Sequence, residues 1–230
     1  LLLTAVLPLA AVIIVLLITW GISINSSAAQ ERERNTLGEM FSPPTSVPKC
    51  SLSRVCPPSH IALRIRSGAA DIVGPTVCFD GKIIMSHALN NVGPGLNIAV
   101  INGEYNTQTS HKHGALSFFY FFFIYTLTKD PKDILAHLKK IKRGMIVLVA
   151  SFDDVTQKMT NEMREIFSEM GSTLISSVKR RDSWVFAGRA GTKIKSLFEK
   201  QAVNDEKNNI YGGWPEMVEV GGCFPRVFSD

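Results

Sequence analysis

The sequence lacks the local motifs by which many enzymes can be recognised. It contains no G-x-S-x-G nucleophile turn, no phosphate-binding G-x-x-x-x-G-K-[ST] loop and no H-E-x-x-H zinc motif. Hydrolysis or group transfer requires an acid–base, nucleophilic or metal-binding set of residues. We therefore predict that the protein is not an enzyme and that it needs no cofactor.

Cysteine is scarce in this chain. There are four cysteines in 230 residues, and no two are spaced as C-x-x-C: Cys50, Cys56, Cys78 and Cys223. This spacing argues against a zinc site, so no bound metal is expected. An even number of cysteines in a protein of the secretory pathway favours two disulfides, for which three pairings are possible.

Positive charge is only slightly in excess, and the net charge of the chain is +5. The densest basic run spans residues 129–143, where the apolar residues recur at the spacing of a helix. The lysines then fall on the opposite, solvated face of that helix. A nucleic-acid partner is not expected, because such proteins usually gather their basic residues into a stripe interleaved with aromatics.

An apolar run without any charge occupies residues 1–24. The small residues of SSAAQ that follow are typical of a cleavage site, so residues 1–29 are predicted to be a signal peptide of a secreted protein. The run also approaches the length that spans a bilayer. The alternative is a retained anchor in the Golgi or another membrane, although Pro8 disfavours a regular helix. Because the sequence begins with Leu, further residues are expected before it.

The first half of the remaining chain has the pattern of antiparallel β structure. Residues 30–49 are polar and then rich in proline and serine, which predicts a flexible linker before a domain at 50–227. Residues 60–67 alternate between apolar and polar side chains, as a half-buried strand does. Asp80-Gly81 and Asn102-Gly103 each predict a two-residue hairpin turn.

The second half mixes helices and strands. Helices are predicted near residues 131–142 and 156–170, the latter ended by Gly171. The continuous apolar run 145–152 predicts a strand covered on both faces, and 183–188 predicts another. This order suggests a βαβ-like crossover. The predicted fold class is α/β of the α+β type, with two antiparallel-rich sheets, flanking helices and disulfides.

Polar and aromatic residues at three places suit ligand binding, and each has a simpler interpretation. Asp153 and Asp154 follow the strand at 145–152, where carboxylates often face a ligand crevice, but they could instead cap the following helix. Arg181 precedes the next strand and could lie in an ordinary surface turn. Trp214 in the GGWP block could stack on a sugar or fill the edge of a core.

Blocks of sequence along this domain resemble the interleukin-like EMT inducer and pancreatic-derived factor family of small secreted, cytokine-like proteins. They cover residues 50–117 and 129–225 in the order of the family: CPPSHIALRIRSGAADIVGPTVCFDGKIIMS, NNVGPGLNIAVING, VLVASFDD, RDSWVFAG and YGGWPEMVEVGGC. The resemblance implies a compact ββα-like domain of two antiparallel sheets with helices outside. It also implies disulfides that pair Cys50 with Cys78 and Cys56 with Cys223.

The same domain is similar to the sugar-binding stem domain of a protein O-mannose N-acetylglucosaminyltransferase, and it is regarded as a GG-type lectin. Carried over to this chain, the sugar-binding pattern falls on position 94, on Asp153 and on Arg181. A guanidinium donates hydrogen bonds to hydroxyls, and a carboxylate accepts them. Pro94 stands where the family usually has Arg, so one donor of the pattern is missing here.

The run FFYFFFIYTLT at 118–128 departs from the family, which has a short acidic-aromatic block at this place. Residues 113–131 are therefore an atypical segment. Eleven residues are too few for a membrane helix. A core strand and a contact with a membrane interface are two interpretations. The hypothesis we favour is an alternative exon, or translated non-coding sequence, that replaces the usual block.

Together these patterns predict a secreted, cytokine-like signalling protein that acts on a cell-surface receptor. Membrane contact is expected only through an uncleaved N-terminal segment. The alternative function is that of a carbohydrate-binding, lectin-type module that recognises glycans on partner glycoproteins. In that case Asp153 and Arg181 are the expected sugar-binding residues.

Overall fold

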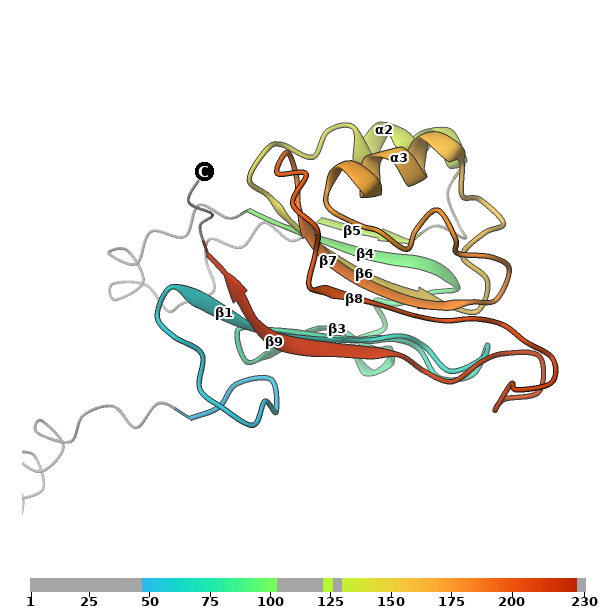
Figure 1. The fold of residues 1–230 in the computed structure, drawn as a ribbon, viewed down its shortest axis with the longest axis horizontal. Helices are drawn as coiled ribbons and strands as arrows, with labels where there is room; N and C mark the ends of the chain where they lie inside the picture. Colours follow the sequence, from blue (N-terminus) through green and yellow to red (C-terminus); the bar gives the residue numbers. More distant parts are fainter. Residues whose placement is uncertain (1–46, 103–121, 126–129, 227–230) are drawn as a thin grey trace, which may run out of the picture. The chain divides into compact units, whose positions relative to one another are not determined.

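A computed structural model of the chain describes residues 47–102, 122–125 and 130–226, and within 122–125 it describes the backbone alone. The predicted signal or anchor segment and nearly all of the predicted linker lie outside these residues. The elements, in chain order (Figure 1), are β1 (His60–Arg66), β2 (Thr76–Phe79), β3 (Lys82–Met85), the 3-10 turn η1 (His87–Leu89), β4 (Gly95–Ile101), β5 (Phe122–Tyr125), α2 (Pro131–Leu138), β6 (Ile146–Phe152), α3 (Asn161–Glu169), β7 (Ser183–Arg189), β8 (Phe198–Ala202) and β9 (Glu219–Pro225).

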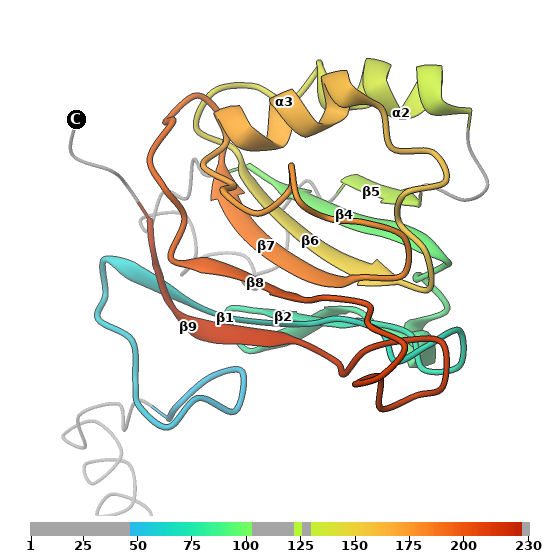
Figure 2. The ribbon, with the colours of Figure 1, turned by 45° about the vertical axis from the view of Figure 1, so that its right-hand side comes forward.

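The described strands form two antiparallel sheets that pack face to face. The four-stranded sheet has the order β3-β2-β1-β9, and the five-stranded sheet has the order β5-β4-β6-β7-β8. Helices α2 and α3 lie over the other face of the five-stranded sheet (Figures 1 and 2). The predicted α+β class with two antiparallel sheets and flanking helices is confirmed. Within the described residues, no helix is long and apolar enough to cross a membrane.

The predicted βαβ-like crossover is wrong. Strands β6 and β7 are direct neighbours and pair antiparallel, with Ile146 opposite Arg189 and Ala150 opposite Val185. A crossover would carry the chain back across the sheet before the next strand begins. Here the connection through α3 returns the chain to the same edge of the sheet at which β6 ends, so β7 runs the opposite way.

Strand β6 is buried along its whole length, which confirms the strand predicted to be covered on both faces. Because successive side chains of a strand point to opposite faces, its residues divide between two cores. Val147 and Val149 pack with the helices, whereas Ile146, Leu148 and Ala150 pack with the four-stranded sheet. The middle layer of the domain is therefore free of solvent on both sides along this strand.

Both predicted helices exist, but each is shorter than its periodicity suggests. Helix α3 begins after the N-cap Thr160, whose hydroxyl accepts the N–H of Met163 at 3.2 Å. The residues before it are held in a turn, because the Asp154 carboxylate accepts the N–H of Thr156 at 2.9 Å. Helix α2 ends at Leu138, beyond which the N–H groups of two residues bond three residues back rather than four.

The predicted end of α3 at Gly171 is confirmed. Gly171 has φ of +97°, and its N–H donates to the carbonyl of Ser168 at 3.0 Å. The N–H of Ser172 donates to the carbonyl of Phe167, also at 3.0 Å, which completes a Schellman motif. A Cβ at this position would lie 1.9 Å from the carbonyl oxygen of Ile194, so no other residue fits.

The hairpin predicted at Asp80-Gly81 joins β2 to β3. Asp80 has φ of +48° and Gly81 has φ of +88°, the left-handed pair that a type I′ turn requires. Asn102 is the last described residue after β4, so the second predicted turn lies outside the described residues. In the atypical aromatic segment, Phe122–Tyr125 form β5, an edge strand beside β4. The rest of that segment is not among the described residues.

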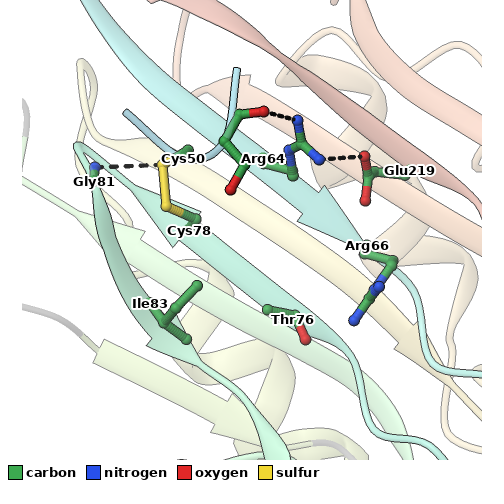
Figure 3. Close-up of a pocket in the computed structure, with 9 residues that line it drawn as sticks. Cys50, Arg64, Arg66, Thr76, Cys78, Gly81, Ile83 and Glu219 are labelled. Atoms are coloured by element: carbon green, nitrogen blue, oxygen red, sulfur yellow. Dashed lines mark hydrogen bonds and ion pairs between the residues drawn. A yellow bond between two sulfur atoms is a disulfide. The ribbon is translucent and has the colours of Figure 1, made fainter. Parts of the chain in front are cut away.

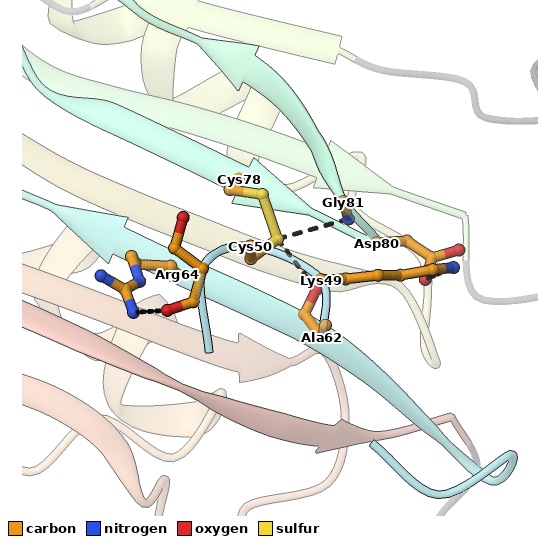
Figure 4. Close-up of a disulfide and its surroundings, with 8 residues drawn as sticks. Lys49, Cys50, Ala62, Arg64, Cys78, Asp80 and Gly81 are labelled. Carbon is orange, nitrogen blue, oxygen red and sulfur yellow. Dashed lines mark hydrogen bonds and ion pairs between the residues drawn. A yellow bond between two sulfur atoms is a disulfide. The ribbon is translucent and has the colours of Figure 1, made fainter. Parts of the chain in front are cut away.

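Two disulfides connect the outer face of the four-stranded sheet to the segment before β1. Cys50 bonds to Cys78 with a Cα–Cα distance of 5.6 Å, and Cys56 bonds to Cys223 with 5.4 Å. These are the two pairs that the family resemblance implies. Around the first bond (Figure 4), Cys50 Sγ accepts the N–H of Gly81 at 3.3 Å. The segment that carries Cys50 therefore lies against the β2–β3 hairpin.

Burial lowers the pKa of Arg189, whose side chain is enclosed at the end of β7. Its guanidinium donates to the carbonyl of Gly144 at 2.7 Å, and to those of Pro225 and Arg226 at 2.7 and 2.8 Å. Backbone carbonyls therefore replace the water that a buried guanidinium loses. Through these contacts Arg189 links the end of β9 to the five-stranded sheet.

Candidate functional site

The candidate site begins with Asp153, which directly follows β6. Asp153 has φ of +57°, a left-handed conformation that an aspartate adopts more readily than most residues. Its N–H donates to the carbonyl of Ala70 at 3.2 Å. This turn ends β6, so the half-buried Asp153 lies at the end of that strand.

Arg181 lies at the matching place, in the turn that leads into β7. Its φ of +61° is again left-handed. The neighbouring Asp182 is buried, and its carboxylate accepts the N–H groups of Lys179 and Asn204, each at 2.7 Å. The carboxamide of Gln201 also donates to Asp182, at 2.7 Å. These bonds fix the backbone from which the Arg181 side chain projects.

Trp214 joins the two residues. Its indole Nε1–H donates to the Asp153 carboxylate at 3.1 Å, and the Arg181 guanidinium carbon lies 4.1 Å from the centre of its ring. The second contact is a cation–π interaction. A carboxylate, a guanidinium and an aromatic ring that are far apart in the sequence thus form one cluster, which we call the Asp153–Arg181–Trp214 cluster.

Gly213 leaves room for this arrangement. A Cβ at position 213 would approach a terminal nitrogen of Arg181 to 2.7 Å. A larger residue would therefore move Arg181 away from the Trp214 ring. Trp214 is half-buried and belongs to none of the three buried apolar clusters among the described residues. The structure therefore does not support the interpretation in which Trp214 fills the edge of a core.

Asp154 has a different role from its neighbour. Its carboxylate accepts the hydroxyl and the N–H of Thr156 at 2.7 and 2.9 Å, and Arg180 Nε lies 3.7 Å from it. The alternative interpretation, in which the two aspartates cap the next helix, is wrong, because Thr160 is the N-cap of α3. Asp154 instead stabilises the loop between Asp153 and the helix.

Position 94 lies beside this end of β6. Gly95, the first residue of β4, pairs with Phe152, which immediately precedes Asp153. The proline at 94 supplies no hydrogen-bond donor. The loop before it is held instead by Asn97, whose carboxamide accepts the N–H of Gly93 and donates to its carbonyl, each at 2.8 Å.

Chemically, the cluster can recognise a ligand with hydroxyl groups and an apolar face. The carboxylate accepts hydrogen bonds and the guanidinium donates them, while the indole ring, one face of which Arg181 covers, adds an apolar surface. Within the described part of the chain, no three side chains of His, Cys, Asp or Glu are grouped so that they could hold a metal ion. Sequence reasoning assigned Asp153 and Arg181 to one site through the resemblance. The only sign of Trp214 was an aromatic residue beside two glycines.

Comparison with known proteins places this geometry in context. A family model described as interleukin-like EMT inducer matches residues 94–192. Protein FAM3C of Danio rerio is 41% identical over 198 residues, which cover 82% of this chain and 83% of that protein. Protein FAM3D of Mus musculus is 42% identical over 178 residues, covering 77% and 75%. Protein FAM3A of Homo sapiens is 40% identical over 178 residues, covering 77% and 73%.

The matched region contains both strands that carry the site, because β6 and β7 lie within residues 94–192. Trp214 lies beyond the end of that region. Identity of about 40% over more than three quarters of the chain is far above what a shared fold alone would give. The chain belongs to the interleukin-like EMT inducer family.

Proposed function

We propose that this protein is a secreted, cytokine-like ligand that acts on a cell-surface partner without catalysing a reaction. Membership in a family described as interleukin-like is the observation that carries this proposal. The two disulfides support it further, because such bonds persist in the oxidising environment of the secretory pathway and the cell exterior.

Expression of the full chain in mammalian cells tests the proposal. We expect soluble protein in the medium, with Cys50–Cys78 and Cys56–Cys223 found by disulfide mapping. The labelled, purified protein is expected to bind intact cells in a saturable way, and unlabelled protein should displace it. Retention of all the protein inside the cell, or binding that does not saturate, would contradict a secreted ligand with a specific partner.

Carbohydrate recognition is a second candidate function, favoured by the Asp153–Arg181–Trp214 cluster. Its three groups suit the hydroxyls and the apolar face of a neutral sugar. Both Asp153 and Arg181 are half-buried, so each keeps part of its side chain open to a ligand. The two functions are compatible, since binding to a glycan on a receptor would serve recognition of that receptor.

A glycan array, followed by calorimetry on the best glycan, tests this second candidate with three variants. Asp153→Asn keeps a residue that tolerates the left-handed backbone but removes the charge, and should weaken binding by about tenfold. Trp214→Phe removes the N–H and keeps a ring, so a smaller loss is expected. Glu165→Ala removes an exposed carboxylate from α3 and serves as the matched control.

The outcomes separate the two candidates. Sugar binding that Asp153→Asn weakens and Glu165→Ala preserves would support the lectin-type function. Saturable binding to cells that survives both Asp153→Asn and enzymatic removal of surface glycans would assign recognition to protein contacts alone. Release of a sugar product from any glycoside by the purified protein would contradict the non-enzymatic part of the proposal.

A further inference from the structure

A partly polar pocket lies on the outer face of the four-stranded sheet, which is turned away from the five-stranded sheet. Its volume is about 440 Å³, within the range of sites that hold small ligands. Side chains from β1, β2, β3 and β9 line it, together with the Cys50–Cys78 disulfide (Figure 3). It shares no residue with the Asp153–Arg181–Trp214 cluster.

The register of the sheet explains which side chains meet here. Arg64 and Arg66 are two residues apart on β1 and so point to the same face. Thr76 on β2 lies directly opposite Arg66, and Glu219 on β9 lies opposite it on the other side. Thr76, Arg66 and Glu219 therefore form one row across three neighbouring strands, while Arg64 lies in the next row.

The two arginines differ in their partners. A terminal nitrogen of Arg64 lies 3.2 Å from the Glu219 carboxylate, and its other terminal nitrogen donates to the carbonyl of Ser51. Arg66 is exposed, and no described carboxylate lies within ion-pair distance of it. In Figure 3 its side chain extends toward Thr76. Glu219 thus offsets one positive charge, and the guanidinium of Arg66 remains available to an anion.

The rest of the lining is mixed in character. Ile83, which is 50% exposed, lies opposite Cys78 on β3, so an aliphatic side chain and a disulfide form one apolar side. Thr76 and Ser51 contribute hydroxyls, and Glu219 contributes a carboxylate. A sugar ring has the matching properties, because it presents hydroxyls at its edges and an apolar face.

The location argues against an extended peptide as the ligand. A peptide strand binds best at an open sheet edge, where backbone N–H and carbonyl groups are unpaired. The pocket lies over β1 and β2, which have hydrogen-bonded neighbours on both sides. Recognition here must therefore use side chains, and a guanidinium fork suits a carboxylate or a sulfate.

We propose that this pocket binds an acidic sugar residue of a glycan chain, either a uronic acid or a sulfated hexose. Arg66 holds the carboxylate or sulfate, Thr76 and Glu219 bond the hydroxyls, and the apolar face of the ring lies against Ile83 and the disulfide. The proposal does not depend on the Asp153–Arg181–Trp214 cluster, whose three groups suit a neutral sugar.

Calorimetric titration of the full secreted chain with a heparin-derived hexasaccharide, at physiological ionic strength, tests the proposal. Arg66→Ala should weaken binding by at least about tenfold, because it removes a charge-assisted, two-pronged contact. Lys132→Ala removes the same charge from an exposed position on α2 and should change the affinity by less than about twofold. Arg66→Lys keeps the charge without the planar fork and should fall between them.

Further probes distinguish the two acidic groups. A hyaluronan hexasaccharide carries carboxylates without sulfates, and a carboxyl-reduced heparin hexasaccharide carries sulfates without carboxylates. Binding of either probe that depends on Arg66 supports the pocket and identifies the group it recognises. Glu165→Ala, at an exposed position of α3 outside both sites, should change all these affinities by less than about twofold, so a loss seen with Arg66→Ala can be assigned to this pocket.

Three results would overturn the proposal. Equal weakening by Arg66→Ala and Lys132→Ala would mean that the glycan is attracted by overall charge alone. Equal affinity for an oligoglutamate peptide, with the same dependence on Arg66, would exclude a preference for sugars. Absence of binding to every probe, by wild-type protein with a folded near-UV circular dichroism spectrum, would exclude the site.

Discussion

The two sheets of this domain achieve stability in different ways. The five-stranded sheet has apolar cover on both faces, from the helices on one side and from the other sheet on the opposite side. The four-stranded sheet has such cover on its inner face, and its outer face carries both disulfides and the two arginines of β1. The difference teaches that covalent links can take the place of a third apolar layer.

Loss of the disulfide that closes the longer loop should lower the free energy of unfolding most. The Cys56–Cys223 bond closes 167 residues and the Cys50–Cys78 bond closes 28. From chain entropy, replacing both cysteines of a bond by serine should lower the free energy of unfolding by about 5 and about 3.5 kcal/mol respectively. Guanidinium denaturation without reductant measures both. Equal losses would mean that native-state contacts, rather than loop length, decide the contribution.

Truncation in the core between the helices and the five-stranded sheet comes next. Phe167 of α3 is fully buried and meets Trp184 edge-to-face, with ring centres 5.7 Å apart. Phe167→Ala should lower the free energy of unfolding by about 3–5 kcal/mol, because it leaves a cavity. Ile83→Ala, on the open face of the other sheet, should change it by less than about 0.5 kcal/mol. Similar losses in urea denaturation would remove the distinction between the two sheets.

At the edge of the five-stranded sheet, hydrogen bonds to one carboxylate should matter less than the core does. Glu199 on β8 accepts the indole N–H of Trp184 at 3.0 Å and the N–H of Thr173 at 2.7 Å. Glu199→Gln should cost about 1–3 kcal/mol, because its carboxamide keeps one oxygen and its nitrogen would then face one of these two donors. Glu165→Gln on exposed α3 is the control. A neutral result for Glu199→Gln would show that water replaces these bonds.

The smallest expected effect lies at the start of the covering helix. Thr160→Ala should lower the free energy of unfolding by about 1 kcal/mol, because the N–H of Met163 loses its acceptor. Thr160→Ser keeps the hydroxyl and should be close to neutral. Both are measured by thermal and urea unfolding. If Thr160→Ser is as damaging as Thr160→Ala, packing of the methyl group matters more than the cap.

The sequence was sufficient to predict elements whose pattern is local. Alternation identified β1, an apolar run identified β6, and Asp80-Gly81 identified the turn between β2 and β3. Strand β9 was missed because its two adjacent glycines are poor strand formers, and it is recruited by β1, far away in the sequence. The direction of β7 also could not be predicted from the sequence, since strand pairing is a property of the whole sheet.

The same reason limits what could be predicted of the sites. Asp153 and Arg181 both contact Trp214 from turns with left-handed backbone, and neither turn contains a glycine that would signal this conformation. The outer pocket was hidden in a similar way. Alternation places Arg64 and Arg66 on one face of a strand. Glu219, which lies opposite Arg66, comes from a strand 153 residues later in the sequence.

The bond between Cys56 and Cys223 also has a mechanical consequence. It joins the segment before β1 to the last strand, β9. Close to this bond, the N–H of Arg226 donates to the carbonyl of Ser59 at 2.8 Å. A force applied to the chain on either side of the domain would run through this one covalent link. The sheets would carry little of the load, and the domain would resist stretching until the link is reduced.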